Sequence, residues 1–188
     1  MKKGLLMIMM VIAIITAKAQ TPLNENGVYE LKVVQEYENI NANNIYERTL
    51  LALSDVMGSN KHSKTNIDVQ DKEGGILVFK GRYFIGYRKV NVSGGYFHYA
   101  DLTLKVRCKD GKAQYTITVP SLYVEWNDAG VSYETVPLTA LFPEYNYKSK
   151  LYYVKKGLIE FSSSLDTSIK EFKDLIIKKT KDEADDDF

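Results

Sequence analysis

Residues 99–119 constrain the fold more than any other stretch, because apolar and polar side chains alternate there on both sides of a turn signal. Successive side chains of a strand point to opposite faces of a sheet, so each apolar row lies on one face. Asp110-Gly111 between the rows is a two-residue sequence typical of tight hairpins. The stretch therefore predicts an antiparallel hairpin with one buried and one wet face. The predicted buried rows are Ala100, Leu102, Leu104, Val106 and Cys108, and then Ala113, Tyr115, Ile117 and Val119.

Two other segments repeat apolar residues at i, i+4, i+7 and i+11, which is the spacing of one face of a helix. Asn41 or Asn44 can cap the start of the first helix, and Gly58 can end it in a left-handed conformation. The apolar stripes are Tyr46, Leu50, Leu53 and Met57 in the first helix, and Leu165, Ile169, Phe172 and Ile176 in the second.

The second helix has more than one candidate start. Ser168 and Glu171 have the spacing of a capping box, whereas Ser164 or Asp166 would begin the helix earlier. Lysines at its C-terminal end suit the helix dipole. The acidic run 182–188 that follows is expected to be a disordered tail.

Gly74-Gly75 raises the question of whether this stretch binds a phosphate or turns the chain. A phosphate-binding loop leads from a strand into the N-terminus of a helix. Here Ile-Leu-Val-Phe follows, which is typical of a strand, so the glycines are predicted to close a hairpin. Strands are predicted at 28–34, 66–71 and 76–79, with a short hairpin of 123–126 and 131–136; the rest of 120–163 is expected to contain short strands or a helical turn.

The order of these elements predicts the α+β class, with an antiparallel β-sheet and helices packed on one face. The arrangement is β-α-β4-α, with extra short elements before the C-terminal helix. A linker at 20–26 would precede a single domain at 27–181. Cys108 is the only cysteine, so no internal disulfide can form; its place in the buried row predicts an inert thiol.

Residues 1–19 have the pattern of a secretory signal peptide. Lys2 and Lys3 precede an apolar run from Gly4 to Ala17, and Ala17-Lys18-Ala19 supplies small residues for cleavage before Gln20. The run is shorter than the roughly 20 residues needed to span a bilayer, so cleavage is favoured over a membrane anchor. The residue directly after the cleavage site is Gln20 and not a cysteine. We therefore expect a protein exported to the periplasm or the exterior that is not a lipoprotein and has no membrane span after cleavage.

Charge argues against nucleic acid as a partner. The chain has 25 basic and 24 acidic residues, and loss of Lys2, Lys3 and Lys18 leaves 22 against 24, a net charge of −2. Nucleic-acid binding usually requires a clear basic excess. The expected partners are an envelope protein or an apolar small molecule.

The residues that could perform catalysis or bind a metal do not form a recognisable motif. His62 and His98 have no partner at metal-ligand spacing, and no G-x-S-x-G sequence occurs. The cluster Asp68, Asp71 and Glu73 does not match a calcium loop. Glu125 beside Trp126 could have a raised pKa if buried. No catalytic residue, metal site or cofactor is predicted, and an enzyme ranks third among the functional hypotheses.

Two binding hypotheses are stronger. A groove between sheet and helix could hold an apolar ligand, although the residues that would line it could equally pack as core. They are Leu104, Val106, Tyr115, Ile117, Phe172 and Ile176. Alternatively, the outer sheet face or the tyrosine-rich segment 128–157 could bind a protein, since tyrosine suits contact surfaces. The tyrosines of this segment are Tyr133, Tyr145, Tyr147, Tyr152 and Tyr153.

Several short features occur together in the order of a known family. They are the export signal, Tyr46-Glu47-Arg48, Asp71 with Gly74-Gly75-Ile76, Lys80-Gly81 and Lys109-Asp110-Gly111-Lys112. Over about residues 28–126 the chain resembles the exported Bacteroidota domain of unknown function with a TBP-like fold. The resemblance implies a β-α-β4-α arrangement and no established activity, so no site residue is carried over. Relatives often have a Trp in the first helix, where this chain has Leu50, Leu51 and Leu53, and residues 128–163 lie outside the resemblance.

Overall fold

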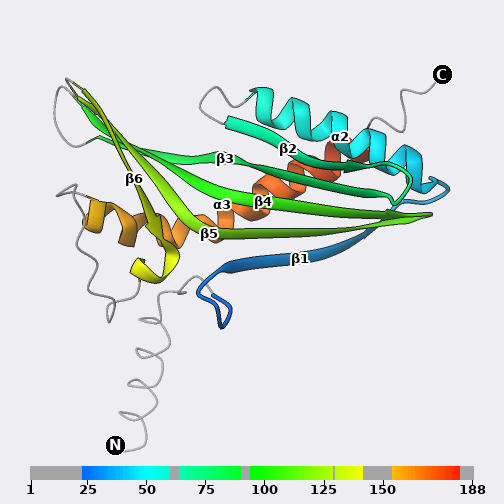
Figure 1. Ribbon diagram of the computed structural model, residues 1–188, viewed down its shortest axis with the longest axis horizontal. Helices are drawn as coiled ribbons and strands as arrows, with labels where there is room; N and C mark the ends of the chain where they lie inside the picture. The colour runs from blue at the N-terminus through cyan, green and yellow to red at the C-terminus, as the bar shows by residue number, and fades with distance from the viewer. Residues whose placement is uncertain (1–22, 60–63, 90–93, 129, 142–153, 183–188) are drawn as a thin grey trace, which may run out of the picture.

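An antiparallel sheet of six strands organises the computed structural model, which describes residues 23–59, 64–89, 94–128, 130–141 and 154–182 (Figure 1). Five strands lie in the order β1-β5-β4-β3-β2, and β6 pairs with the second half of β5. The strands are β1 Tyr29–Glu36, β2 Lys64–Asp71, β3 Ile76–Lys89, β4 Gly95–Lys109, β5 Lys112–Asp128 and β6 Gly130–Pro137. The helical elements are α2 Ala42–Ser59, the 3-10 turn η1 Leu138–Leu141 and α3 Val154–Asp182.

Both α-helices lie on the same face of the sheet. Helices α2 and α3 contact each other, and both contact β3, β4 and β5 (Figure 1). We call the face of the sheet that they cover the inner face and the opposite face the outer face. The α+β class predicted from the sequence is confirmed, and β6 and η1 are the extra short elements expected before the last helix.

The predicted central hairpin is present with its two apolar rows facing the helices. Leu104 pairs with Ile117 and Val106 pairs with Tyr115, and all four side chains are buried. The turn uses Gly111 with φ of +73°, a conformation that costs glycine little. Alternation on both strands therefore predicted the two buried rows correctly.

The start of α2 is held by the same hairpin turn. Asn41 Oδ1 accepts a hydrogen bond from the Asn44 backbone N–H at 2.8 Å, so Asn41 is the cap. Asp110 Oδ1 accepts from the Ala42 N–H at 2.9 Å. The prediction for the other end is wrong, because Gly58 lies inside the last turn and has no left-handed φ. The helix ends instead at Ser59, whose hydroxyl donates to the Val56 carbonyl at 3.0 Å.

The diglycine stretch closes the hairpin between β2 and β3, as predicted. Asp71 Oδ1 accepts from the Gly74 N–H at 2.8 Å, and Gly75 has φ of +63°. The Gly75 carbonyl also accepts from the Cys108 N–H at 2.8 Å. A side chain at Gly75 would meet the Cys108 carbonyl oxygen at 2.6 Å, so glycine is needed for both conformation and space.

Helix α3 begins at Val154, well before any start predicted from the sequence. Ser168 and Glu171 lie inside it, so the predicted capping box is wrong. Gly157 and the serine run 162–164 have low helix propensity, so the sequence did not predict the first turns of α3. Tertiary packing outweighs such local preferences in most helices of folded proteins.

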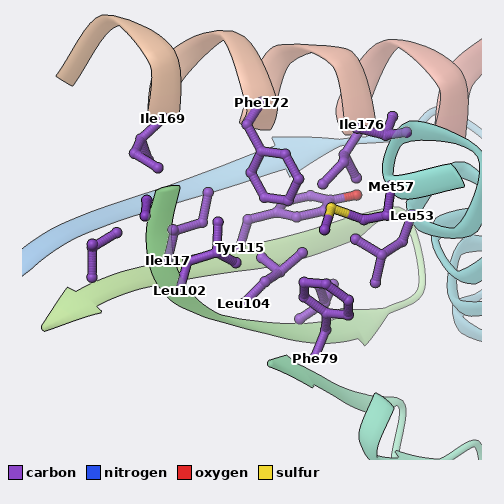
Figure 2. Packing of buried hydrophobic residues seen from close by; sticks show 14 of the residues in the cluster. Leu53, Met57, Phe79, Leu102, Leu104, Tyr115, Ile117, Ile169, Phe172 and Ile176 are labelled. Atoms are coloured by element: carbon purple, nitrogen blue, oxygen red, sulfur yellow. The ribbon is translucent and has the colours of Figure 1, made fainter. Parts of the chain in front are cut away.

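The six residues predicted to line a groove lie in the closed core instead. Each is at most 1 % exposed and belongs to the main hydrophobic cluster. Figure 2 shows Ile169, Phe172 and Ile176 of α3 reaching between Ile117, Tyr115 and Leu104 of the sheet. The structure therefore shows the packed alternative for these residues, because the helix side chains occupy the space in which a ligand would lie.

Polar groups inside this core are paired. The Tyr37 and Tyr115 hydroxyls lie 2.5 Å apart, and Thr49 Oγ1 lies 3.4 Å from the Tyr115 hydroxyl. Burial raises the pKa of both tyrosines, so they remain neutral at physiological pH. At the edge of the core, the Tyr29 hydroxyl donates to Asp166 Oδ1 at 2.8 Å and so joins β1 to α3.

The sheet bends at the point where β5 stops pairing with β1 and starts pairing with β6. On β5, pairing with β1 ends at Val119 and pairing with β6 begins at Ser121, and the register with β4 shifts at the same level. Pro120 sits at this break, where its missing N–H interrupts no continuous ladder. Beyond it, β3–β6 continue past the ends of β1 and β2 as a four-stranded arm (Figure 1).

The predicted leader 1–19 and tail residues 183–188 lie outside the described residues. Asp182, which was expected to begin the tail, is the last residue of α3. No helix within the described ranges is long and apolar enough to cross a membrane.

We expect Phe172→Ala to lower the free energy of unfolding by about 3–5 kcal/mol, because it removes a fully buried ring and leaves a cavity. The ring lies 4.7 Å from that of Tyr83. Urea denaturation followed by circular dichroism would measure the change. Leu175→Ala is the matched control, since Leu175 on the same helix is 43 % exposed and should cost less than about 1 kcal/mol. Equal losses would contradict the packing described here.

Candidate aromatic binding face

Aromatic side chains gather on the outer face of the arm. Strand register places Tyr99 between Phe84 and Tyr123, and Glu125 between Phe97 and Tyr133. These positions alternate with the buried inner residues of the same strands. We call the group the aromatic patch; it comprises Phe84 and Tyr87 of β3, Phe97 and Tyr99 of β4, Tyr123 of β5 and Tyr133 of β6.

Ring contacts run across all four strands of the arm. The centroid distances are 4.7 Å for Tyr87–Phe97, 6.3 Å for Phe97–Phe84, 5.7 Å for Phe84–Tyr99, 5.9 Å for Tyr99–Tyr123 and 5.6 Å for Tyr123–Tyr133. Such spacings are those of interacting aromatic pairs. The patch is therefore one continuous surface rather than a set of separate residues.

The patch has a buried centre and exposed ends. Tyr99 and Tyr123 are only 5 % and 7 % exposed, although neither belongs to the main hydrophobic cluster. Tyr87 and Tyr133 are 46 % and 69 % exposed. Two large aromatic side chains thus face solvent at opposite sides of a packed aromatic layer.

A polar cluster borders the patch at the bend of the sheet. Arg82 Nε donates to Asp101 Oδ1 at 2.9 Å, and the Ser121 hydroxyl donates to Asp101 Oδ2 at 3.2 Å. The Arg82 guanidinium carbon lies 3.6 Å from the centroid of the Tyr123 ring, within cation–π range. The arginine covers one face of Tyr123 and contributes to its burial.

Glu125 lies on the patch itself. Its cross-strand neighbours are Phe97 and Tyr133, and its side chain is partly exposed. Trp126 belongs to the opposite face, where its ring lies 4.4 Å from that of Tyr96. The glutamate and tryptophan singled out together in the sequence therefore point to opposite sides of the sheet.

The carboxylate of Glu125 lies close enough to the centre of the patch to affect the pKa of Tyr99. Burial, and then the nearby charge of Glu125, raise the pKa of Tyr99 to about 12. Tyr123 has a raised pKa for the same first reason. The central tyrosines consequently present neutral hydroxyls at physiological pH.

The residues considered for catalysis lie apart. Asp71 caps the β2–β3 turn, His98 is fully buried on the inner face of the arm, and Glu125 lies on the outer face. Asp68 forms an ion pair with Lys80 at 2.8 Å. Among the described residues, no three His, Cys, Asp or Glu side chains are placed to hold a metal ion. His62 lies outside the described residues.

Cys108 has the buried position that the sequence predicted. Its side chain lies in the main hydrophobic cluster, and burial raises the pKa of the thiol to about 11. The thiol is therefore protonated at physiological pH.

One of the five predicted contact tyrosines, Tyr133, belongs to the patch, whereas Tyr145, Tyr147, Tyr152 and Tyr153 lie outside the described residues. The other five patch residues were missed by the sequence analysis. A signal was available for three of them, because Phe97 and Tyr99 continue the outward parity of Asp101 and Thr103, and Phe84 continues that of Lys80 and Arg82. The bulges in β3 and β5 shift the parity before Tyr87 and Tyr123 are reached.

Comparison with known families agrees with this architecture. Residues 32–123 match the model of the domain of unknown function DUF4468 with TBP-like fold. The chain contains a DUF4468 domain. The resemblance drawn from the sequence is thereby confirmed. No curated protein matches the chain.

Solved structures similar to this chain share its fold. A TBP-like protein from Parabacteroides distasonis has a TM-score of 0.58 at 11 % identity, covering 85 % of this chain and 96 % of its own. A DUF4468 family protein from Bacteroides ovatus has a TM-score of 0.56 at 15 % identity, with coverages of 86 % and 91 %. The shared fold extends beyond residues 32–123, and at these identities it carries no statement about activity.

The buried histidine generates a prediction about pH. Burial lowers the pKa of His98 from 6.5 to about 4, so the unfolded chain takes up a proton at higher pH than the folded protein. The free energy of unfolding should therefore have its full value above about pH 6.5 and fall by roughly 3 kcal/mol as the pH drops to 4. Urea denaturation across this range would measure it. His98→Gln should flatten the dependence; an unchanged slope in that variant would contradict the assignment.

Proposed function

We propose that the protein is a non-enzymatic binding module that holds a protein partner against the aromatic patch. The observation that carries the proposal is the exposure of Tyr87 and Tyr133 at the two ends of a continuous aromatic layer. Tyrosine is enriched at protein interfaces, where its ring packs and its hydroxyl bonds to polar groups.

The orientation of the rings favours a protein over a flat ligand. A nucleobase stacks face to face on an aromatic side chain. Four of the five neighbouring ring pairs are inclined by 45° to 63°, and one pair, Tyr123–Tyr133, is stacked at 27°. Such an uneven surface is better suited to side chains that insert edge-to-face between the rings.

The inner face gives less support to a binding role. The residues proposed for an interior ligand are packed against each other, and Phe172 and Ile176 are fully buried among them. A ligand there would have to displace the helix. The outer face needs no such rearrangement, which supports placing the partner there.

We also propose that the module acts outside the cytoplasm after its leader is removed. The support is the basic start, apolar run and small-residue cleavage pattern of residues 1–19. The intact mass of protein isolated from its native envelope fraction would test this, since removal of residues 1–19 would leave Gln20 at the N-terminus.

The double variant Tyr87→Ser/Tyr133→Ser should lose most partner capture, because truncating exposed aromatic contacts costs about 2 kcal/mol or more at a binding hot spot. Tagged protein would be incubated with a native envelope extract, and the retained partner quantified by mass spectrometry. We expect less than about a tenth of the wild-type amount. Circular dichroism would establish that the variant is folded.

Leu51→Ser is the matched control for loss of an exposed apolar side chain. Leu51 lies on α2 and is 59 % exposed, away from the patch. Its substitution should leave capture unchanged. Equal capture by the double variant, or an equal loss with Leu51→Ser, would count against the aromatic patch as the binding face.

A further inference from the structure

The aromatic patch holds one carboxylate, Glu125, among its rings. Arg82 and Asp101 neutralise each other through their 2.9 Å ion pair. Glu125 has no ion pair with any part of the chain that the structure describes. Lys89 lies at the β3 edge of the patch, two residues beyond Tyr87 on the same face, so Glu125 is the one carboxylate placed among the aromatic rings.

Aromatic rings surround this carboxylate. Glu125 is directly opposite Phe97 on one neighbouring strand and Tyr133 on the other, and Tyr123 precedes it by two residues on the same face. Directly opposite residues of antiparallel strands have Cβ atoms about 4.5–5.5 Å apart. A group that approaches Glu125 must therefore also contact aromatic rings, of which Tyr133 is 69 % exposed.

A cation is the group that complements this arrangement. The faces of aromatic rings attract positive charge through their quadrupole, and a carboxylate adds a direct ionic partner. The surface already accommodates one such contact, because the Arg82 guanidinium carbon lies 3.6 Å from the Tyr123 centroid. An apolar or acidic group covering Glu125 would instead leave the carboxylate desolvated without a counter-charge.

We infer that the segment bound to the aromatic patch presents a Lys or Arg side chain to Glu125. The cation would pair with the carboxylate and lie against the ring of Tyr133, while neighbouring apolar side chains of the segment contact the rest of the patch. This inference rests on the proposed function and extends it, since it specifies a basic segment of a protein as the occupant.

Peptide binding tests the inference directly. Three fluorescein-labelled decapeptides would be titrated with the full-length protein and followed by fluorescence anisotropy. They alternate Tyr with Lys, with Gln or with Glu. We expect the Lys–Tyr peptide to bind about tenfold more tightly than the Gln–Tyr peptide, as a charge-assisted contact allows. The Glu–Tyr peptide should bind most weakly, and added salt should reduce the preference for lysine.

Glu125→Gln should remove the preference for lysine, so that the Lys–Tyr and Gln–Tyr peptides bind with similar affinities. Glu30→Gln is the matched control, because Glu30 is an exposed carboxylate of β1 that pairs with Thr118, away from the aromatic rings. It should retain the preference. Loss of the preference in both variants would reveal a general charge effect and overturn the assignment to Glu125.

Tyr133→Ser separates this inference from the proposed function. If it weakens all three peptides while wild-type protein binds the Lys–Tyr and Gln–Tyr peptides equally, the aromatic patch remains the binding face and the lysine inference fails. Failure of all three peptides to bind would also overturn the inference. So would a sedimentation experiment that shows a dimer which excludes the Lys–Tyr peptide, because a second copy would then occupy the patch.

Discussion

Packing of the α3 stripe into the apolar row of the β4–β5 hairpin is the interaction on which the other features depend. Phe172 and Ile176 enter the row that contains Tyr115 and Ile117, and all four side chains are at most 1 % exposed (Figure 2). Burial of this apolar area supplies the main stabilising free energy. It also explains the paired hydroxyls of the core, because a buried polar group without a partner would oppose the same contact.

Because the helices close the inner face of the sheet, the outer face is the side of the sheet that remains open to a partner. The bulges near Pro120 and in β3 allow the strands to bend and continue as an arm beyond β1 and β2. Six aromatic residues occupy outward positions on the arm around Glu125, whereas the outward side of the central hairpin carries threonine, lysine, arginine and glutamine. The fold thus separates a structural face from a contact face within the same strands.

Much of this architecture could be predicted from the sequence where side-chain periodicity is uninterrupted. The rows around Asp110-Gly111 and the stripe ending at Ile176 gave the correct elements and faces. The early start of α3 could not be read, because Gly157 and neighbouring serines obscure a helix stabilised by tertiary contacts. The aromatic patch was also missed as a whole, since it forms only when four strands align and bulges change which residues point outward.

Hydroxyl-radical footprinting of individual tyrosines tests most directly whether one face is sealed and the other open. Oxidation of the folded protein would be quantified residue by residue by mass spectrometry. The account predicts rapid modification of Tyr87 and Tyr133 and strong protection of Tyr37 and Tyr115, in line with their exposure. Modification of Tyr115 as fast as that of Tyr133 would contradict it.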